Sequence, residues 1–600
     1  LVGKRNATSV IRKYFGYKKD DADQKQVLCR ECLAVGATTR RNTTNLFDHL
    51  SRHHKALYDE CRARSDCRPK QKTISDAFAS VTPHEKGSKW QKDITDAITF
   101  HLAKDMVPIN TVTKHGFANM IRSLDQRYVM PSRTYFSQIA IPELYDKCKA
   151  QVETELLSQV KFYAATTDLW SSRTTEPYIS LTVHFVDEGF QLRSPCLQTA
   201  FFPNDHTGEN IAMGMREALA AWGLDEKCLI TITTDNAANM VKATALNKWT
   251  RLQCFGHRLH LAIENAVKRD GRIDRATGIC KKLVSHFSHS WMARSALEKA
   301  QKPLNLPVHS LISECQTRWG SRQMMISRIL EQQKALTQVL SEDKKARHLI
   351  STWQDIDVLE SVSKTLGPLL DFTDALSGED YVSVSYVKPV LHLFNTSMLL
   401  THDEDTDLTK TLKNEMLYYL NEKYKDDATQ ELLDVASCLD PRFKMDYINA
   451  DNKPKVKTRI ASEMMECQEE IVSCSTEVQH KVAETSQAKK AKKSLGSFFK
   501  QSGATAKSVF SVAIKDAVEA ELNSYLLTPS IDKEGDPLAW WKTHKVSFPH
   551  LAKLARKYLC IPATSSPSER VFSASGNIIT CQRSSLKPAM VDRLVFLAKN

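Results

Sequence analysis

Two aspartates that each end an expected β-strand constrain the fold of this 600-residue chain more than any other feature. Asp168 ends the first of these strands and Asp235 ends the fourth. The strands and one helix follow the order β-β-β-α-β, over residues 162–167, 178–186, 197–202, 210–222 and 228–234. In a mixed sheet of this order the ends of the first and fourth strands can lie side by side, so we expect both carboxylates at one edge.

A pair of carboxylates at one sheet edge suits metal-dependent phosphoryl transfer. An aspartate at the end of a strand is more often a turn or cap residue, so neither aspartate is informative alone. Together they can share two divalent ions about 3.5–4 Å apart, which activate a water or a 3′ hydroxyl. Hard oxygen ligands favour Mg²⁺ or Mn²⁺. A third carboxylate usually completes such a site, and residue geometry alone leaves Glu569, Glu209 and Glu264 as candidates.

A Cys-x₂-Cys and His-x₄-His pattern near the start of the chain predicts a zinc site. Cys29 and Cys32 are followed, after 16 residues, by His49 and then by either His53 or His54. Two cysteines facing two histidines about one helical turn apart supply the four tetrahedral ligands that Zn²⁺ prefers. Residues 1–72 also hold 17 basic and 8 acidic side chains, and thus most of the net charge of +13. This excess indicates a polyanionic partner.

Composition and periodicity divide the chain into six segments. We expect a zinc finger over residues 1–72, a small helical domain over 73–160 and an α/β segment over 161–245. A helical block over 246–453 then interrupts what the strands began, followed by a flexible polar and basic linker over 454–508 and a segment of apolar helical spacing over 509–600. The lysine run at 489–493 is either a nuclear localisation signal or a solvated surface. No membrane span or secretory signal is present, so we expect an intracellular protein with reduced cysteines. The chain begins at Leu1 rather than Met, so we expect the natural N-terminus to lie upstream.

Motifs from one end of the chain to the other resemble the hAT superfamily of cut-and-paste DNA transposases and their domesticated relatives. They lie at residues 167–172, 206–211, 234–240, 254–260, 317–321, 536–541 and 569–573. The resemblance implies a ribonuclease H-like core split by an all-helical insertion, a C-terminal dimerisation region, and Asp168, Asp235 and Glu569 as an Asp-Asp-Glu triad. It also implies that His257, Arg318 and Trp319 contact DNA. Trp319 would stack on an extruded base, which contributes about 1–3 kcal/mol.

The first segment resembles the BED zinc finger. Residues 9–15 and 44–50 carry this resemblance, which favours His54 over His53 as the fourth zinc ligand. Arg12 stands where that family usually has a tryptophan, so one packing contact differs.

We therefore expect a multidomain α+β protein that acts as a nuclear DNA transposase. It would bind terminal repeats and target double-stranded DNA as a dimer or larger homo-oligomer, with structural Zn²⁺ and catalytic Mg²⁺ or Mn²⁺. The alternative is a domesticated, non-catalytic DNA-binding transcriptional regulator, which would be free to lose any of the three acids. A DEDD exonuclease is disfavoured, because Trp170 stands where its second acid would be.

Overall fold

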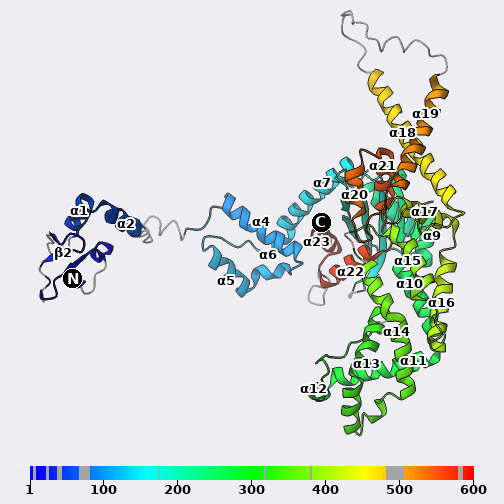
Figure 1. Cartoon of the computed structure of the whole chain (residues 1–600), viewed down its shortest axis with the longest axis horizontal. Helices are drawn as coiled ribbons and strands as arrows, with labels where there is room; N and C mark the ends of the chain where they lie inside the picture. Colours follow the sequence, from blue (N-terminus) through cyan, green and yellow to red (C-terminus); the bar gives the residue numbers. More distant parts are fainter. Residues whose placement is uncertain are drawn as a thin grey trace, which may run out of the picture. The chain divides into compact units, whose positions relative to one another are not determined.

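The computed structural model describes most of the chain as two compact units. The described residues are 1–3, 9–21, 24, 26–36, 43–66, 82–172, 175–315, 319–376, 378, 381–480, 506–578 and 586–600. One unit comprises residues 1–92 and 115–130, and the other comprises residues 93–114 and 131–600 (Figure 1). The fold is mixed α+β, and it contains a sheet-based domain and a helical domain.

The N-terminal residues form a small antiparallel sheet with two helices. The strands β1 (Phe15–Tyr17), β2 (Val27–Cys29) and β3 (Val35–Gly36) follow a short 3₁₀ helix, η1 (Val10–Lys13), and precede α1 (Thr44–His53) and α2 (Lys55–Asp66). Leu46 and Leu50, one turn apart on α1, are fully buried against Phe15 and Val27. This core is small, so additional stabilisation from a metal is physically reasonable.

The segment expected to be helical, residues 73–160, consists of helices joined by loops in its described part. Its elements are α4 (Lys89–Lys104), η2 (Ile109–Thr113), α5 (His115–Leu124), α6 (Arg133–Tyr135), η3 (Phe136–Ala140) and α7 (Ile141–Gln159). Residues 73–81 lie outside the described residues. The segment does not form one separate body, because residues 93–114 and 131–160 belong to the second compact unit.

A mixed sheet forms the centre of the second unit. Its order is β6-β5-β4-β8-β9, with β7 also paired to β5, and the strands are β4 (Tyr163–Ser171), β5 (Pro177–Val186), β6 (Leu192–Arg193), β7 (Cys196–Phe201), β8 (Leu229–Thr234) and β9 (Arg251–Gln253). β4 runs antiparallel to β5 and parallel to β8. The interior strands are buried on both faces, which requires covering helices. The predicted pairing of the first and fourth strands is thus confirmed.

The sheet extends beyond its predicted limits. β4 continues past Asp168 to Ser171, because it pairs with β5 up to Pro177. β9 adds a parallel strand beyond residue 245, where the sequence suggested that the insertion begins. Between β7 and β8, α8 (Gly208–Ala221) forms the expected crossover helix. After β8 comes α9 (Ala238–Leu246).

Helices follow β9 for about two hundred residues, as predicted. They are α10 (Phe255–Lys268), α11 (Gly271–His289), α12 (Trp291–Gln301), α13 (Trp319–Glu342), η5 (Arg347–Leu349), α14 (Trp353–Leu376), η6 (Val384–Tyr386), α15 (Val387–Leu393), η7 (Phe394–Met398), α16 (Asp407–Lys423) and α17 (Asp427–Cys438). One apolar core runs from the sheet into these helices. Among the described residues, no helix combines the length and apolar content needed to cross a bilayer.

The prediction of a flexible linker over residues 454–508 is wrong for its first half. α18 (Lys453–His480) occupies that stretch and packs against α19 (Ala506–Leu527), whereas residues 481–505 lie outside the described residues. Val456, Ile460 and Met464 are buried at helical spacing on α18, which the polar composition obscured. The described residues after α19 form the helices α20 (Pro537–His544), α21 (Pro549–Leu559), α22 (Ser566–Ile578) and α23 (Pro588–Lys599).

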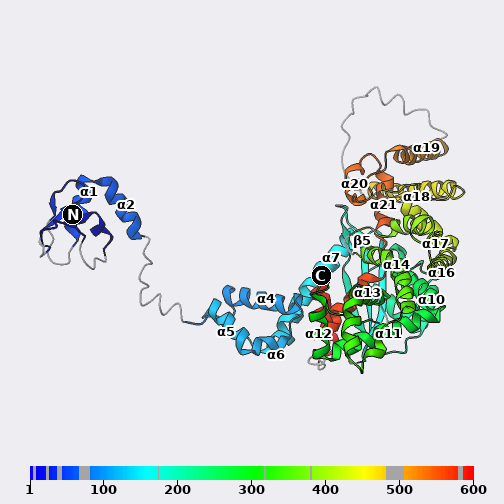
Figure 2. The ribbon, with the colours of Figure 1, turned by 60° about the horizontal axis from the view of Figure 1, so that its bottom comes forward.

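The C-terminal helices return to the sheet. α21 packs on β5, α22 packs on β4 and β5, and α23 packs on β7 and α7. The views in Figures 1 and 2 both show the red α23 and the cyan α7 near the C-terminus. Segments more than 300 residues apart in the sequence therefore complete one domain.

Candidate functional site

Asp168 and Asp235 lie at the same edge of the sheet. Thr166 on β4 is opposite Thr233 on β8 in the parallel ladder, and each aspartate follows two residues later. Because the two strands run in the same direction, their carboxyl ends meet at one edge. The structure thus brings together the two aspartates that the sequence singled out.

Glu569 reaches this edge from the first turn of α22. The Ser568 hydroxyl donates a 2.9 Å hydrogen bond to the Thr166 hydroxyl, which attaches this turn directly to β4. The Ser565 hydroxyl donates to a Glu569 carboxylate oxygen over 3.3 Å. The ring of Phe572, one turn further along α22, lies 5.3 Å from the ring of Trp170. A residue 334 positions after Asp235 is therefore held beside the aspartates.

The pKa of Asp168 reflects the proximity of Asp235 and Glu569. Burial, together with the charges of Asp235 and Glu569, raises the pKa of the Asp168 carboxyl to about 7. The Leu169 backbone N–H donates a 2.8 Å hydrogen bond to Asp168 and opposes this shift. A carboxyl beside two other negative charges ionises more readily when a cation compensates the charge. The three hard oxygen donors thus fit Mg²⁺ or Mn²⁺ in chemical type.

A tighter group of donor atoms lies beside the triad. Within the described residues, one ligand atom from each of Cys254, His257 and Glu569 falls within 4.8 Å of the others, and Asp168 and Asp235 are not part of this set. Nδ1 of His257 lies 3.6 Å from a Glu569 oxygen. Hydrogen bonding to Cys254, and then the charges of Glu569 and Asp168, raise the pKa of His257 to about 9.

The backbone holds the Cys254–His257 pair in place. Cys254 follows β9 directly and its N–H donates a 2.9 Å hydrogen bond to the carbonyl of Thr234, one residue before Asp235. Ser565 N–H in turn lies 3.2 Å from the Cys254 sulfur. From the sequence, Cys254 and His257 form half of a site without a second pair. Spacing could not reveal that the third group is Glu569, more than 300 residues away.

The other two candidate acids already have cationic partners. Glu209 lies 2.6 Å from the Lys242 ammonium, which lowers its pKa. Glu264 lies 2.9 Å from the Arg322 guanidinium and is largely buried. Of the three glutamates considered, Glu569 is the one whose charge acts on Asp168.

The structure does not describe the side chains of two predicted DNA contacts, Arg318 and Trp319. Arg318 lies outside the described residues. Trp319 is the first residue of α13, but its side chain is likewise not described. Both assignments remain predictions, whereas His257 is located beside the carboxylates.

The predicted zinc ligands form a four-membered cluster in the N-terminal unit. One ligand atom from each of Cys29, Cys32, His49 and His54 lies within 4.8 Å of the others, and His53 is not in the group. The Cys32 sulfur is 3.3 Å from Nε2 of His49, and interaction with the His54 side chain lowers the pKa of the Cys32 thiol. Nε2 of His54 is buried and has no hydrogen-bond partner among the described residues. An orphaned imidazole nitrogen beside two thiols fits Zn²⁺.

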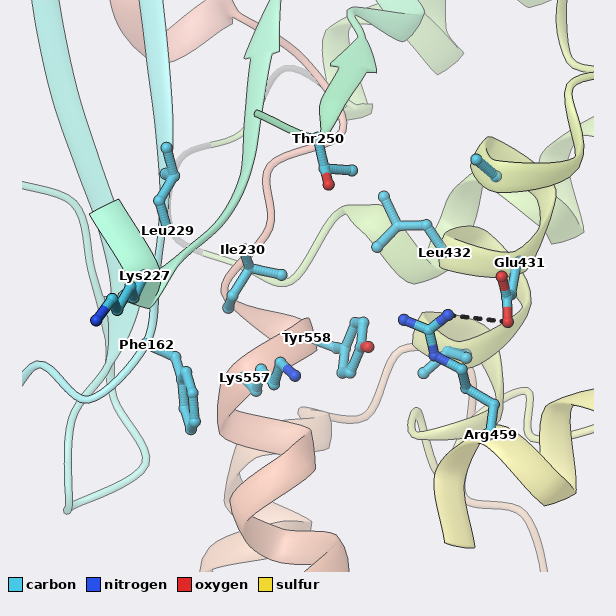
Figure 3. A pocket seen from close by; sticks show the side chains of 12 residues that line it. Phe162, Lys227, Leu229, Ile230, Thr250, Glu431, Leu432, Arg459, Lys557 and Tyr558 are labelled. Carbon is cyan, nitrogen blue, oxygen red and sulfur yellow. Dashed lines mark ion pairs between the residues drawn. The ribbon is translucent and has the colours of Figure 1, made fainter. Parts of the chain in front are cut away.

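A cavity of about 370 Å³ lies at the opposite end of the sheet (Figure 3). Its walls include Phe162, Leu229 and Thr250, which lie at the starts of β4, β8 and β9. On the helical side, Arg459 and Glu431 form a 3.0 Å ion pair, drawn as a dashed line in the figure. The cavity is therefore separate from the carboxylates at the other ends of these strands.

Three segments of the chain match known protein families. Residues 521–600 match the hAT family C-terminal dimerisation region. Residues 166–254 match the ZBED1 RNase-like domain, and residues 252–365 match the ZBED1 RNase-like helical domain. These matches support a relationship to the hAT-type transposases or to their domesticated relatives.

Some relatives of the chain are named as transposases, and others are named as zinc finger proteins or as a transcriptional regulator. Human zinc finger BED domain-containing protein 4 is 26% identical over 96% of this chain and 51% of its own length. A putative AC transposase of Zea mays is 24% identical over 82% of this chain and 64% of its own length. A putative transcriptional regulator of Talaromyces stipitatus is 21% identical over 95% of this chain and 68% of its own length. The chain thus spans about half of the human protein.

Proposed function

We propose that this chain is a cut-and-paste DNA transposase that cleaves and joins DNA through Asp168, Asp235 and Glu569. The observation that carries the proposal is the attachment of α22 to β4 through Ser568 and Thr166, beside the parallel strands that end in the two aspartates. Bound Mg²⁺ or Mn²⁺ would supply an activated nucleophile and stabilise the leaving oxygen. The triad would hold these ions, and His257, 3.6 Å from Glu569, would contact the DNA beside them.

We assign the contacts with DNA ends to other parts of the chain. A BED-type zinc finger over residues 1–72, holding Zn²⁺ through Cys29, Cys32, His49 and His54, and the helical segment over 73–160 would bind terminal repeats. The basic excess of the first segment supports this assignment. Trp319 would stack on a base extruded near the cleaved end, and Arg318 would neutralise phosphate. Self-association through the C-terminal region and a nuclear location complete the proposal.

The second candidate function is a non-catalytic DNA-binding regulator of transcription. The observation that favours it is the similarity to a putative transcriptional regulator over nearly the whole chain. Such a protein would keep the zinc cluster and the self-association surface. Its acidic residues would be free of the demands of catalysis, so their substitution would have no consequence for DNA processing.

Cleavage of DNA ends by purified full-length protein distinguishes the two functions. With Mn²⁺ or Mg²⁺ and a library of duplex ends, we expect cleaved and joined products from the natural protein. Asp168→Asn, Asp235→Asn and Glu569→Gln should each abolish these products while DNA binding stays nearly intact, because each removes a charge that holds the metal. The three losses should not add, since the triad acts as a unit.

Glu209→Gln is the matched control, because Glu209 pairs with Lys242 on the surface and does not act on Asp168. It should retain cleavage. Selective DNA binding without any cleavage by the natural protein would favour the regulator. Strong cleavage by Glu569→Gln would refute the choice of third acid.

A further inference from the structure

We propose that Cys254, His257 and Glu569 form a second metal site, selective for Zn²⁺ over Mg²⁺, and that its occupation reversibly inhibits DNA cleavage. Zinc binding follows from the side chains alone. The inhibition rests on the proposed function, because it requires Glu569 to serve the catalytic ions.

The donor atoms are close enough to converge on one ion. The three ligand atoms lie within 4.8 Å of one another, and Nδ1 of His257 is 3.6 Å from the Glu569 carboxylate. Zinc bonds of about 2.0–2.3 Å place tetrahedral ligands roughly 3.3–3.8 Å apart. The histidine–glutamate separation already falls in that range. Rotation of the Glu569 side chain can supply the remaining ~1 Å of contraction.

The chemical type of the donors separates this site from the triad. A thiolate and an imidazole bind Zn²⁺ and other borderline ions far more strongly than they bind Mg²⁺, which prefers oxygen. Three protein ligands with an open fourth position form the usual coordination of an accessible zinc ion. Cys254 is the buried member of the cluster and is 1% exposed. The side chains of His257 and Glu569 are 36% and 42% exposed. An ion can therefore enter from solvent between the histidine and the glutamate.

The surroundings of the sulfur suit a thiolate ligand. The Ser565 N–H points at the sulfur over 3.2 Å, and a backbone N–H donor stabilises negative charge there. The Ser565 hydroxyl also donates to Glu569, so one residue orients two of the three ligands. Cys254 itself is fixed by its N–H bond to the carbonyl of Thr234.

A Zn²⁺ ion at this site and the catalytic ions would compete for the Glu569 carboxylate. When Glu569 coordinates Zn²⁺ with Cys254 and His257, it turns from Asp168 toward the start of α10. The catalytic ions then lose one of their three carboxylates, and the His257 ring is held by the zinc and no longer free to contact DNA. Both changes reduce cleavage, and removal of zinc restores it.

Cobalt titration of the full-length protein tests the binding. With Zn²⁺ already in the N-terminal cluster, added Co²⁺ should give a thiolate-to-cobalt charge-transfer band from one further ion. Cys254→Ser should abolish the band, and His257→Gln should weaken binding at least tenfold. Serine still accepts the hydrogen bond from Ser565, so Cys254→Ser should remain folded, as circular dichroism would verify. The control Cys148→Ser, on α7 and outside both clusters, should leave the band unchanged.

Inhibition is measured as the ratio of cleavage with and without Zn²⁺ at constant Mg²⁺, normalised to each variant's own rate. We expect micromolar Zn²⁺ to reduce the ratio at least tenfold in the natural protein. Cys254→Ser should shift the inhibitory concentration upward at least tenfold. A cobalt band unaffected by Cys254→Ser would overturn the site. If the band behaves as expected but the natural protein cleaves no DNA, the transposase proposal and the inhibition fail, and the metal site stands.

Discussion

A buried histidine links the sheet to the helix that carries Glu569, and its titration gives a quantitative prediction. His184 on β5 is 2% exposed. Its Nε2 lies 3.0 Å from the Thr166 hydroxyl, and its Nδ1 lies 2.9 Å from the Ser194 hydroxyl. Thr166 also accepts from Ser568, so the ring is joined to α22 through one hydroxyl. In the neutral imidazole one ring nitrogen donates and the other accepts, whereas protonation makes both nitrogens donors and would disrupt one of these two bonds.

The size of the effect follows from the pKa of His184. Burial lowers this pKa from 6.5 to about 3. In the unfolded chain His184 is protonated below about pH 6.5, whereas in the folded chain it is protonated only below about pH 3. The free energy of unfolding therefore falls as the pH falls from 6.5 to 3. Between pH 7.5 and pH 5 the loss amounts to about 2 kcal/mol, and its limit below pH 3 is about 5 kcal/mol.

Hydrogen exchange of peptides from β4 and β5 measures the loss locally. Opening free energies at pH 7.5 and pH 5, corrected for intrinsic exchange rates, should differ by about 2 kcal/mol more in the natural protein than in His184→Gln. Glutamine can accept and donate the same bonds but does not titrate. His101→Gln, on the exposed face of α4, should behave like the natural protein. Equal pH dependence in His184→Gln and the natural protein would refute the reasoning.

Three further predictions concern the zinc cluster, DNA binding and the core. Metal analysis of the full chain should show that Cys29→Ser or His54→Ala loses one zinc ion, whereas His53→Ala retains it; the reverse for the two histidines would contradict the ligand assignment. Affinity for selected DNA ends, followed by fluorescence anisotropy, should fall steeply with salt and depend on residues 1–160. Equal selectivity without those residues would exclude this location. Trp541→Ala should reduce the unfolding free energy in urea by about 3–5 kcal/mol, because this side chain is fully buried and donates to a backbone carbonyl; a loss below about 1 kcal/mol would contradict this packing argument.

The strands β5 and β8 were predictable because their amino-acid composition is typical of β-strands. β5 and β8 are rich in β-branched side chains, and each is bounded by turn residues. Their order predicted the meeting of Asp168 and Asp235. β9 was not predictable, because three residues between two helices carry no periodicity and gain their conformation only by pairing with β8.

The third acid could not be chosen from the local sequence. Glu569, Glu209 and Glu264 look alike in the sequence, and only the resemblance to a family favoured Glu569. Their differences arise from tertiary partners, which are Lys242 for Glu209, Arg322 for Glu264 and the Asp168 edge for Glu569. The Cys254 cluster was missed for the same reason, since no spacing rule relates residues separated by more than 300 positions.

The number of residues between Asp235 and Glu569 also determines how long the ribosome takes to add the third acid after the second. A ribosome adds about 5–20 residues per second, so the 334 intervening positions take about 17–67 s. During that interval the nascent chain already holds the zinc cluster and both aspartates but lacks α22. Under the proposed function, a product terminated between Asp235 and α22 would keep residues 1–160 and occupy DNA ends without cutting them. Premature termination would then produce a competitor of the complete enzyme rather than a merely inactive fragment.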